Sequence, residues 1–536
     1  MFKSKKGKTE ELLANFSKIK KGNFYFNSIG KYFLKCEKTS AFQVISDKTY
    51  QDLDLDEVFM YIDRTLSKVG QQFLYHSFRT IPDNSERFDR FEHLIKVLNE
   101  HSELKEAVIK QLSKLNTNEA YYISSLFLED HFQKPEWFFV VPLLSLISVI
   151  SLSLSFFFPQ FLLLLVPVLA VNYFIHYWNR ESFVQYSGSI LQLLTLNQVA
   201  KEFVKAEVLA EANQEITKSI QSIDGIGVRM SLFKLEAKIQ SDVGQAVESL
   251  TDIIKALFLI EPIVFFNVLR KLDSKRNEIH RLYKLIGEID VAISIDFLRK
   301  ELPYYSVSTL TDKEKQLRAK DIYHPLLLDS VANSIDIHRK SVLLTGSNMS
   351  GKTTFIRTIG INVIMSQTLN TCFAREFAHP RLKVHSAIRI ADDLMNDKSY
   401  YFEEVTTIKK MLEESRSGAQ NLFLLDEMFK GTNTVERIAA GKSVLSYLNE
   451  ENNIVFISSH DLELADYLSE SYDLYHFTEI VENENILFDF KLKAGQLKTT
   501  NAIRILELND YPLEIILEAQ ELSKQIKEEK NNKRIF

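Results

Sequence analysis

The stretch Gly346–Thr353 reads GSNMSGKT and has the residue types and spacing of a loop that holds phosphate groups. Its glycines permit a backbone whose N–H groups point inward, and the helix expected from Lys352 onward adds its N-terminal dipole. We expect Lys352 to reach the β and γ phosphates of a nucleotide and the Thr353 hydroxyl to ligate Mg²⁺. The residues expected to bind ATP are Gly346, Ser347, Asn348, Met349, Ser350, Gly351, Lys352, Thr353 and Thr354.

Two apolar runs downstream of this loop end in polar side chains. Residues 421–427 read NLFLLDE, and residues 454–460 read IVFISSH. Because α/β sheets bind ligands at the carboxyl ends of their strands, we expect Asp426 to hold Mg²⁺ and Glu427 to orient the attacking water. His460 is suited to hydrogen-bonding the γ phosphate. The predicted activity is ATP hydrolysis with Mg²⁺ as cofactor, and the predicted catalytic residues are Lys352, Glu427 and His460.

Each of these features has a plainer interpretation when it is taken alone. An acidic strand end can have no task, and a histidine at the end of a strand is more often structural than functional. Here a phosphate loop and two polar strand ends occur in one region of the chain. This combination favours one shared site for phosphoryl transfer.

The same segments resemble the ATPase domain of the MutS family of DNA mismatch repair proteins. TGSNMSGKTT, LLDEMFKGTNT and SSHDLEL have the order and wording of that domain's phosphate loop, Walker B strand and histidine segment. Residues 391–405, ADDLMNDKSYYFEEV, are similar to its signature segment, with Ser399 at the position of the signature serine. The resemblance implies a homodimer in which Ser399 contacts the nucleotide held by the partner subunit, so monomers should be poor ATPases.

Further segments extend this resemblance over the larger part of the chain. Residues 58–84, VFMYIDRTLSKVGQQFLYHSFRTIPDN, are similar to the start of the MutS core, and YHPLL at residues 323–327 is similar to the lead-in to the phosphate loop. Residues 492–512, LKAGQLKTTNAIRILELNDYP, resemble the end of the ATPase domain. The resemblance implies DNA as a partner, with mismatched or structured DNA as the substrate class, and no residue is predicted to contact the adenine.

Other features depart from the family and leave alternatives open. The core pattern begins near residue 53, which leaves no room for the family's mismatch-reading domain, and the sequence left for its DNA clamp is short. One alternative is therefore an ATP-driven membrane switch that acts on an unknown protein partner without binding DNA. Another is an ABC transporter ATPase, which would need an LSGGQ-like signature, and residues 414–421, ESRSGAQN, resemble that motif only faintly.

Residues 137–179 contain no Asp, Glu, Lys or Arg and are mostly Leu, Val, Ile, Phe and Ser. Pro159 and Gln160 divide them into two runs, each about long enough to cross a hydrocarbon layer of roughly 30 Å as a helix. Trp137 lies at one end and Trp178 near the other, as expected at membrane interfaces. The prediction is a transmembrane hairpin that anchors the protein with both termini and the ATPase domain in the cytoplasm; the alternative is an apolar hairpin buried in a soluble fold.

The elements that position these residues change character along the chain. Apolar residues recur at helical spacing in residues 53–98 and 181–300, where Pro262 is the one proline of the second stretch, and this predicts long packed helices. After about residue 312, short apolar runs alternate with helical stretches, as in α/β domains. The predicted fold class is α + α/β. Its parts are an N-terminal segment at 1–50, a helical MutS-type core and lever domain at 51–311 with the hairpin at 137–179, and an ABC-type P-loop ATPase domain with C-terminal helices at 312–536.

Composition excludes several other classes. The 65 basic and 71 acidic residues give a net charge of −6, so no global field attracts nucleic acid. Basic residues between Arg270 and Lys284 alternate with Asp273 and Glu278, which favours a solvated helix face over a DNA-binding patch. The two cysteines, Cys36 and Cys372, have no metal-ligand spacing, which indicates a reducing compartment and no zinc site.

Overall fold

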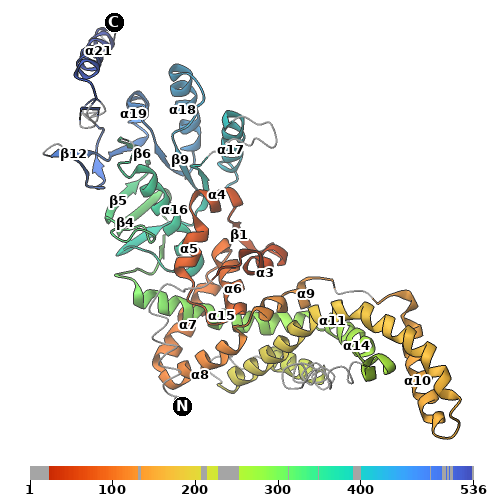
Figure 1. Ribbon diagram of the computed structural model, residues 1–536. Coiled ribbons are helices and arrows are strands. Elements are labelled where there is room, and N and C mark those ends of the chain that lie inside the picture. Colours follow the sequence, from red (N-terminus) through yellow and green to blue (C-terminus); the bar gives the residue numbers. More distant parts are fainter. Residues whose placement is uncertain are drawn as a thin grey trace. The chain divides into compact units, whose positions relative to one another are not determined.

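The architecture comes from a computed structural model, in which helices and strands both occur (Figure 1). By its internal contacts the chain divides into two compact units, which are interleaved along the sequence. The structure describes residues 23–130, 134–206, 214–226, 253–311, 313–347, 349–389, 400–482, 485–497, 503, 506–507 and 511–533.

Both units are built from discontinuous parts of the chain. The described residues of unit 1 fall within Met1–Thr39, Ile62–Arg79 and Asn84–Glu301, and those of unit 2 within Ser40–Tyr61, Thr80–Asp83 and Leu302–Phe536. The mixed helical and sheet class agrees with the sequence prediction. The predicted domain boundaries at residues 50/51 and 311/312 remain predictions.

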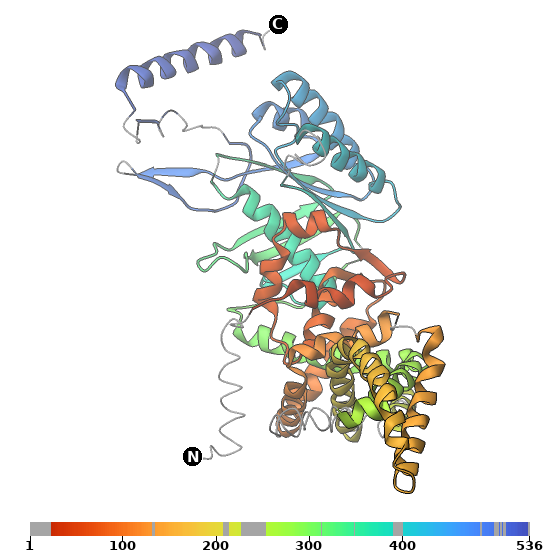
Figure 2. The same cartoon turned by 45° about the vertical axis from the view of Figure 1, so that its right-hand side comes forward.

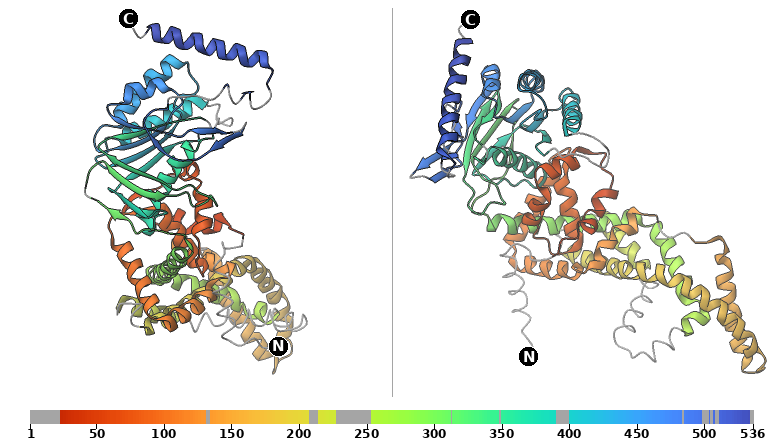
Figure 3. Two further views of the ribbon diagram at one scale, coloured as in Figure 1. Left: turned by 90° about the vertical axis from the view of Figure 1, so that its left-hand side faces the viewer. Right: turned by 45° about the horizontal axis from the view of Figure 1, so that its top comes forward.

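A six-stranded sheet forms the centre of unit 2, with strand order β14-β11-β6-β10-β9-β8 (Figure 3, left). All neighbouring strands are parallel except β14, which pairs antiparallel with β11. The central strands are buried along their length, as their continuous apolar sequences predict. The strands are β6 (Ser341–Thr345), β8 (Lys383–Ala387), β9 (Asn421–Asp426), β10 (Ile454–Ser458), β11 (Tyr472–His476) and β14 (Lys493–Ala494).

Helices cover both faces of this sheet. On one face Phe423 and Ile457 belong to an apolar cluster with side chains of α17, α18 and α19. On the other face Phe355 of α16 packs against Phe456, with ring centroids 6.5 Å apart. Alternate residues of each strand therefore serve opposite layers. The described helices of the C-terminal part of unit 2 include α16 (Lys352–Leu369), α17 (Tyr400–Glu414), α18 (Thr434–Leu448), α19 (Leu462–Leu468) and α21 (Leu513–Lys533).

Smaller strand groups complete unit 2. A four-stranded sheet has the order β3-β7-β4-β5, and β12 pairs antiparallel with β13. Their bounds are β3 (Thr309–Leu310), β4 (Gln316–Ile322), β5 (Asn333–His338), β7 (Glu376–His379), β12 (Glu479–Glu482) and β13 (Asn485–Phe488).

A short N-terminal segment also belongs to unit 2. It contains the strand β1 (Ala41–Val44) and the helices α4 (Asp47–Asp52) and α5 (Leu55–Ile62). The strand β1 pairs with β2 (Thr80–Pro82), and the last residue of α5 is the first of the second part of unit 1. The carboxylate of Asp52 is fully buried and receives hydrogen bonds at the end of β8, from the hydroxyl of Ser386 and the N–H groups of Ile388 and Arg389. These charge-assisted hydrogen bonds fasten the segment to the central sheet.

Unit 1 is helical in its described part. The 26-residue helix α15 (Arg276–Glu301) packs on α6 (Lys68–Arg79), and the Asp290 carboxylate accepts the N–H groups of Leu66 and Ser67, just before α6 begins. The remaining helices include α2 (Phe26–Ile29), α3 (Lys31–Lys35), α7 (Glu86–Glu100), α8 (Ser102–Leu112), α9 (Ser125–Leu128), α10 (Val140–Ser155), α11 (Phe161–Lys205) and α14 (Ile260–Asp273), with short 3₁₀ turns η1 (Ser113–Leu115), η2 (Asn118–Ile123) and η3 (Glu136–Phe139).

The apolar stretch forms a helical hairpin, in which α10 runs beside the first part of α11 (Figure 2). Two helices in the described residues, Glu136–Ser155 and Phe161–Trp178, are long and apolar enough to cross a membrane by length and composition. Only 22% of each of these windows is buried within the protein. The hairpin therefore presents most of its apolar side chains at the surface of the structure.

Candidate nucleotide site

The phosphate-type loop lies between β6 and α16, as the sequence predicts for a strand, loop and helix in that order. Gly346 has φ 145° and Gly351 has φ 109°, both in the region that favours glycine. A Cβ atom on Gly346 would lie 2.5 Å from the carbonyl oxygen of Phe477, so only glycine fits there. Met349 is exposed on the outside of the loop, and Asn348 lies outside the described residues.

Lys352 is buried at the start of α16, and its ammonium group closes the loop. Its Nζ donates hydrogen bonds of 2.8 Å to the carbonyl oxygens of both Gly346 and Ser347. Burial lowers the pKa of Lys352, with nearby carboxylates opposing that effect. On the other side of the loop, the Ser347 hydroxyl donates a hydrogen bond of 2.7 Å to the buried carboxylate of Glu479. The Ser350 hydroxyl donates to the Ser347 carbonyl.

Thr353 and Asp426 meet although 73 positions separate them in sequence. The Thr353 hydroxyl donates a hydrogen bond of 2.9 Å to Asp426 Oδ2, and the Ser458 hydroxyl donates to Asp426 Oδ1. The two predicted metal ligands therefore lie side by side, between the start of α16 and the ends of β9 and β10. A hydroxyl and a carboxylate are hard oxygen ligands of the kind that Mg²⁺ prefers.

Glu427 and His460 also lie together, at the ends of neighbouring parallel strands. His460 Nε2 is 2.5 Å from Glu427 Oε1, and Lys430 Nζ is 2.7 Å from Glu427 Oε2. The hydrogen bond from His460 lowers the pKa of Glu427 to about 2, against an opposing effect of burial and with help from Lys430. Glu427 is therefore a carboxylate at neutral pH. The expected contact of His460 with a phosphate remains a prediction.

Glu404 was not among the residues predicted from the sequence, yet it holds the turn that follows Glu427. Its side chain in α17 is almost fully buried, and Oε1 accepts a hydrogen bond of 2.5 Å from the N–H of Phe429. Both Glu427 and Phe429 have positive φ, 47° and 58°, so this turn is strained for L residues. Glu404 lies five positions after Ser399, which itself lies outside the described residues. The resemblance of residues 391–405 to the signature segment assigns a role to Ser399 and none to Glu404.

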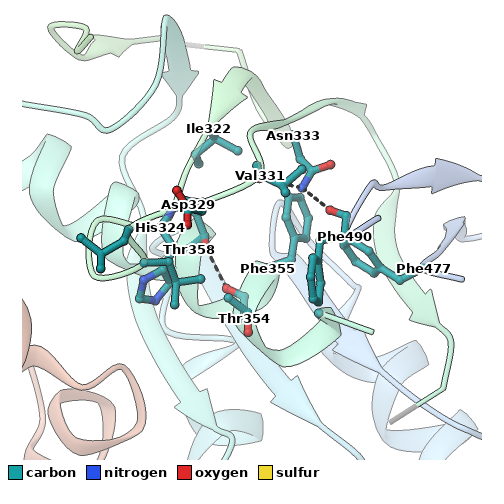
Figure 4. A pocket seen from close by; sticks show the side chains of 14 residues that line it. Ile322, His324, Asp329, Val331, Asn333, Thr354, Phe355, Thr358, Phe477 and Phe490 are labelled. Carbon is teal, nitrogen blue, oxygen red and sulfur yellow. Dashed lines mark hydrogen bonds between the residues drawn. The ribbon is translucent and has the colours of Figure 1, made fainter. Parts of the chain in front are cut away.

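A cavity of about 400 Å³ opens beside the loop and was also not predicted (Figure 4). Its lining includes Gly351 and Thr354 from the start of α16, together with three phenylalanine rings that lie close together in Figure 4. They are Phe355, Phe477 and Phe490. The Asn333 side chain holds the backbone at Phe490 by donating a hydrogen bond of 3.0 Å to its carbonyl oxygen. The cavity offers aromatic faces to a flat ring.

Comparison with known proteins agrees with this geometry. Residues 342–527 match the family described as MutS domain V. The chain is 26% identical to the DNA mismatch repair protein MutS of Listeria welshimeri over 322 residues, which cover 58% of this chain and 36% of the relative. The protein of the same name from Caldanaerobacter subterraneus is 24% identical over 349 residues, which cover 62% and 36%. The human MutS protein homolog 4 is 27% identical over 376 residues, which cover 65% and 36%.

The chain is a divergent member of the MutS family. Its match to domain V begins in β6 and contains every site residue predicted between Gly346 and His460. The matched region spans 36% of the length of each of these MutS relatives. Within domain V the structure brings Lys352, Thr353 and Asp426 to one edge of the sheet, with Glu427 and His460 at the same edge.

Proposed function

We propose that this chain is a MutS-type ATPase that binds and hydrolyses ATP in composite sites formed by two copies, and that it acts on mismatched or structured DNA in a process related to mismatch repair. Unit 2 is then an ABC-type P-loop ATPase domain. The observation that carries the proposal is the meeting of Lys352, the Thr353–Asp426 pair and the Glu427–His460 pair at one sheet edge. The similarity to DNA mismatch repair proteins supports the link to DNA.

The residues at this edge fit ATP and Mg²⁺. The two carbonyl oxygens that hold the Lys352 ammonium group belong to the loop itself, so a phosphate can replace them without a large movement. Thr353 and Asp426 would hold Mg²⁺, which when bound neutralises charge on the β and γ phosphates. The adenine would stack in the adjacent cavity, against Phe490 and its neighbouring rings.

The chain's own groups then divide the work of hydrolysis. Lys352 binds and orients the terminal phosphates, because its charge is already positioned at the mouth of the loop. Glu427 is ionised and can accept a hydrogen bond from a water molecule in line with the γ phosphate. His460 and Lys430 hold that carboxylate in place. Glu404 keeps the turn after Glu427 in its strained conformation.

Two further parts of the proposal concern assembly and location. Ser399 would reach the nucleotide of the partner subunit, so that ATP closes the homodimer and hydrolysis relaxes it. The α10–α11 hairpin would anchor each subunit in a membrane, with both termini and the ATPase domain in the cytoplasm. The length and exposed apolar surface of the hairpin support the membrane anchoring.

The first experiment measures the ATPase rate of detergent-purified protein against protein concentration, with and without duplex, mismatched and branched DNA. We expect a rate per subunit that rises with concentration, and a further rise with mismatched or branched DNA. Filter binding at two salt concentrations should show weaker DNA binding at the higher one, because phosphate contacts release counterions. Lys352→Ala should remove nucleotide binding, and Lys442→Ala, a change in α18, should leave it intact.

The outcomes separate the proposed function from the alternative. ATPase activity without any DNA binding would overturn the DNA part and favour an ATP-driven membrane switch that acts on a protein partner. Nucleotide binding that persists in Lys352→Ala would overturn the assignment of the phosphate loop. The similarity to DNA mismatch repair proteins favours the first reading over the switch.

A further inference from the structure

The hairpin reverses the usual distribution of polar and apolar side chains. Ser148 and Asn172, which face the seam between α10 and α11, are fully buried, and the Asn172 amide donates a hydrogen bond of 3.1 Å to the Ser148 hydroxyl. On the outside, the side chains of Phe157, Leu163 and Phe174 are 79%, 76% and 73% exposed. Helices that pack in a membrane bury small and polar residues against one another and turn apolar ones to lipid.

A third segment docks on this polar seam. Residues 253–258 are helical, Leu259 interrupts the helix with φ 48°, and α14 begins at Ile260. The interruption matters for the Phe258 carbonyl, because its helical hydrogen-bond partner would be residue 262, a proline without an N–H group. The hydroxyl of Ser145 in α10 donates a hydrogen bond of 2.7 Å to that carbonyl.

The neighbouring carbonyl is bound from the other helix of the hairpin. The Asn172 amide of α11 donates a hydrogen bond of 2.8 Å to the carbonyl oxygen of Leu257. Side chains from both hairpin helices therefore satisfy the backbone where the third segment breaks. An unsatisfied carbonyl at membrane depth costs several kcal/mol, so irregular backbone occurs there only where protein or water satisfies it.

Charged groups of the third segment contact the hairpin near Trp137 and Trp178, at the end opposite to its turn. Glu261 is buried, with its carboxylate 3.0 Å from Lys255 Nζ and 3.2 Å from His176 Nδ1. His176 lies two positions before Trp178, whose ring packs against Trp137 at a centroid distance of 5.1 Å. Tryptophan is enriched at the membrane–water interface, and charged side chains are rare deeper in the lipid. Asn172 lies six residues from Trp178 along α11, which is about 9 Å deeper at 1.5 Å per residue.

We propose that residues 253–261 form a third membrane-embedded segment, a broken helix that enters the same lipid layer as the hairpin and returns. Its break lies at the depth of Asn172 and Ser145, which supply the missing backbone donors. Lys255 and Glu261 mark the interface at its two ends. This inference rests on the proposed membrane anchoring of the hairpin and extends it to a region where the sequence indicated only an ordinary helix.

Lipid is the occupant that the observations favour over a protein partner. The surface around the seam is apolar on both hairpin helices, and the third segment adds the exposed side chain of Ile260, which lies between Lys255 and Glu261. Ser145, Ser148 and Asn172 of the hairpin turn inward, where they bind one another or the backbone carbonyls of the third segment. A protein interface of this size would carry a polar rim around its apolar centre.

Single cysteines test the depth of each segment. Full-length Cys36→Ser protein, with the buried Cys372 kept, is reconstituted into phosphatidylcholine vesicles and treated on both sides with a membrane-impermeant maleimide. Leu163→Cys reports on the hairpin, Ile260→Cys on the third segment, and Arg270→Cys on the exposed part of α14 as control. We expect the first two to label about tenfold more slowly than the third, with full labelling after denaturation in dodecyl sulfate.

The pattern of labelling separates two failures. If Leu163→Cys is protected and Ile260→Cys labels as fast as Arg270→Cys, the third segment lies outside the lipid and only this inference fails. If Leu163→Cys labels as fast as the control, the membrane anchoring itself is wrong. Protection of all three positions would also overturn the inference, because α14 would then be shielded throughout by protein.

Removal of a donor from the seam tests how the segment is held. Asn172→Leu leaves the Leu257 carbonyl without its amide donor, and we expect the labelling of Ile260→Cys to rise about tenfold while Leu163→Cys stays protected. Ser145→Ala should act in the same direction through the Phe258 carbonyl. Ser153→Ala is the matched control, because that exposed hydroxyl bonds within its own helix. Equal labelling in Asn172→Leu and Ser153→Ala would show that the seam does not hold the segment.

Discussion

The nucleotide site of unit 2 and the hairpin of unit 1 place their polar groups in opposite ways. In unit 2, β9 and β10 are mostly apolar and buried; Asp426 ends β9, and Glu427 and His460 follow the two strands and pair with one another. In the hairpin, Ser148 and Asn172 lie in the middle of apolar helices and are fully buried, while the surrounding apolar side chains are exposed.

The difference teaches what burial of a polar group achieves in each place. At the sheet edge, polar and titratable groups are held in pairs but remain within reach of a ligand. In the hairpin seam, the polar side chains are neutral, and those of Ser145 and Asn172 donate hydrogen bonds to backbone carbonyls of another segment. Three further changes can break or sharpen this contrast.

The largest effect is expected from Glu427→Gln. The amide keeps the shape of the side chain but cannot polarise water, so turnover should fall by about 100- to 1,000-fold with ATP binding retained. Single-turnover hydrolysis and nucleotide binding measure the two steps separately. Glu413→Gln, an exposed carboxylate of α17, is the control. Turnover that is equal in both variants would show that another group positions the water.

A charge placed on the hairpin should have the next largest effect. Val166 of α11 is 67% exposed, and Lys in the middle of a membrane span costs about 2.5–3.5 kcal/mol. Val166→Lys should therefore reduce the fraction of protein that resists alkaline extraction from membranes. Val435→Lys changes an equally apolar residue of α18, 79% exposed, and should have no such effect. If both variants fractionate as the parent does, the hairpin is not in lipid.

The smallest effect concerns a buried group that can titrate. His379 in β7 is fully buried, and burial lowers its pKa to about 4 from an ordinary value of 6.5. Because the unfolded chain takes up this proton first, stability is complete above pH 6.5 and falls as the pH drops toward 4, by about 2 kcal/mol at pH 5.

Urea unfolding of the parent and of His379→Gln at pH 7.5 and pH 5 measures this contribution. The parent should lose more stability than the variant does over that interval. Equal losses in parent and variant would contradict the role given to His379.

The site could be predicted from the sequence where its residues belong to local motifs. Gly346, Lys352 and Thr353 follow from one loop, and Asp426, Glu427 and His460 follow from strands that end in polar residues. Glu404 and Phe490 could not be predicted in this way, because their roles depend on contacts with distant segments. The spacing of apolar residues in the sequence does not indicate contacts between segments that lie far apart along the chain.

The same limit applied to the fold. Helices and an α/β region followed from apolar spacing, whereas the attachment of residues 40–61 to unit 2 depends on contacts between segments far apart in sequence, such as the bonds of the Asp52 carboxylate at the end of β8. The prediction noted Pro262 but not the break at Leu259, since a proline in a helical pattern does not say which carbonyl loses its partner or what replaces it.

The order in which the chain is synthesised determines when the Phe258 carbonyl can find its hydrogen-bond donor. Translation produces Ser145 and Asn172 about a hundred residues before Phe258, so both donors have left the ribosome when the acceptor appears. If the broken helix were translated before the hairpin, the carbonyls of Leu257 and Phe258 would lack a side-chain donor until the hairpin was made. The sequence order thus makes the hairpin a template on which the later segment is assembled.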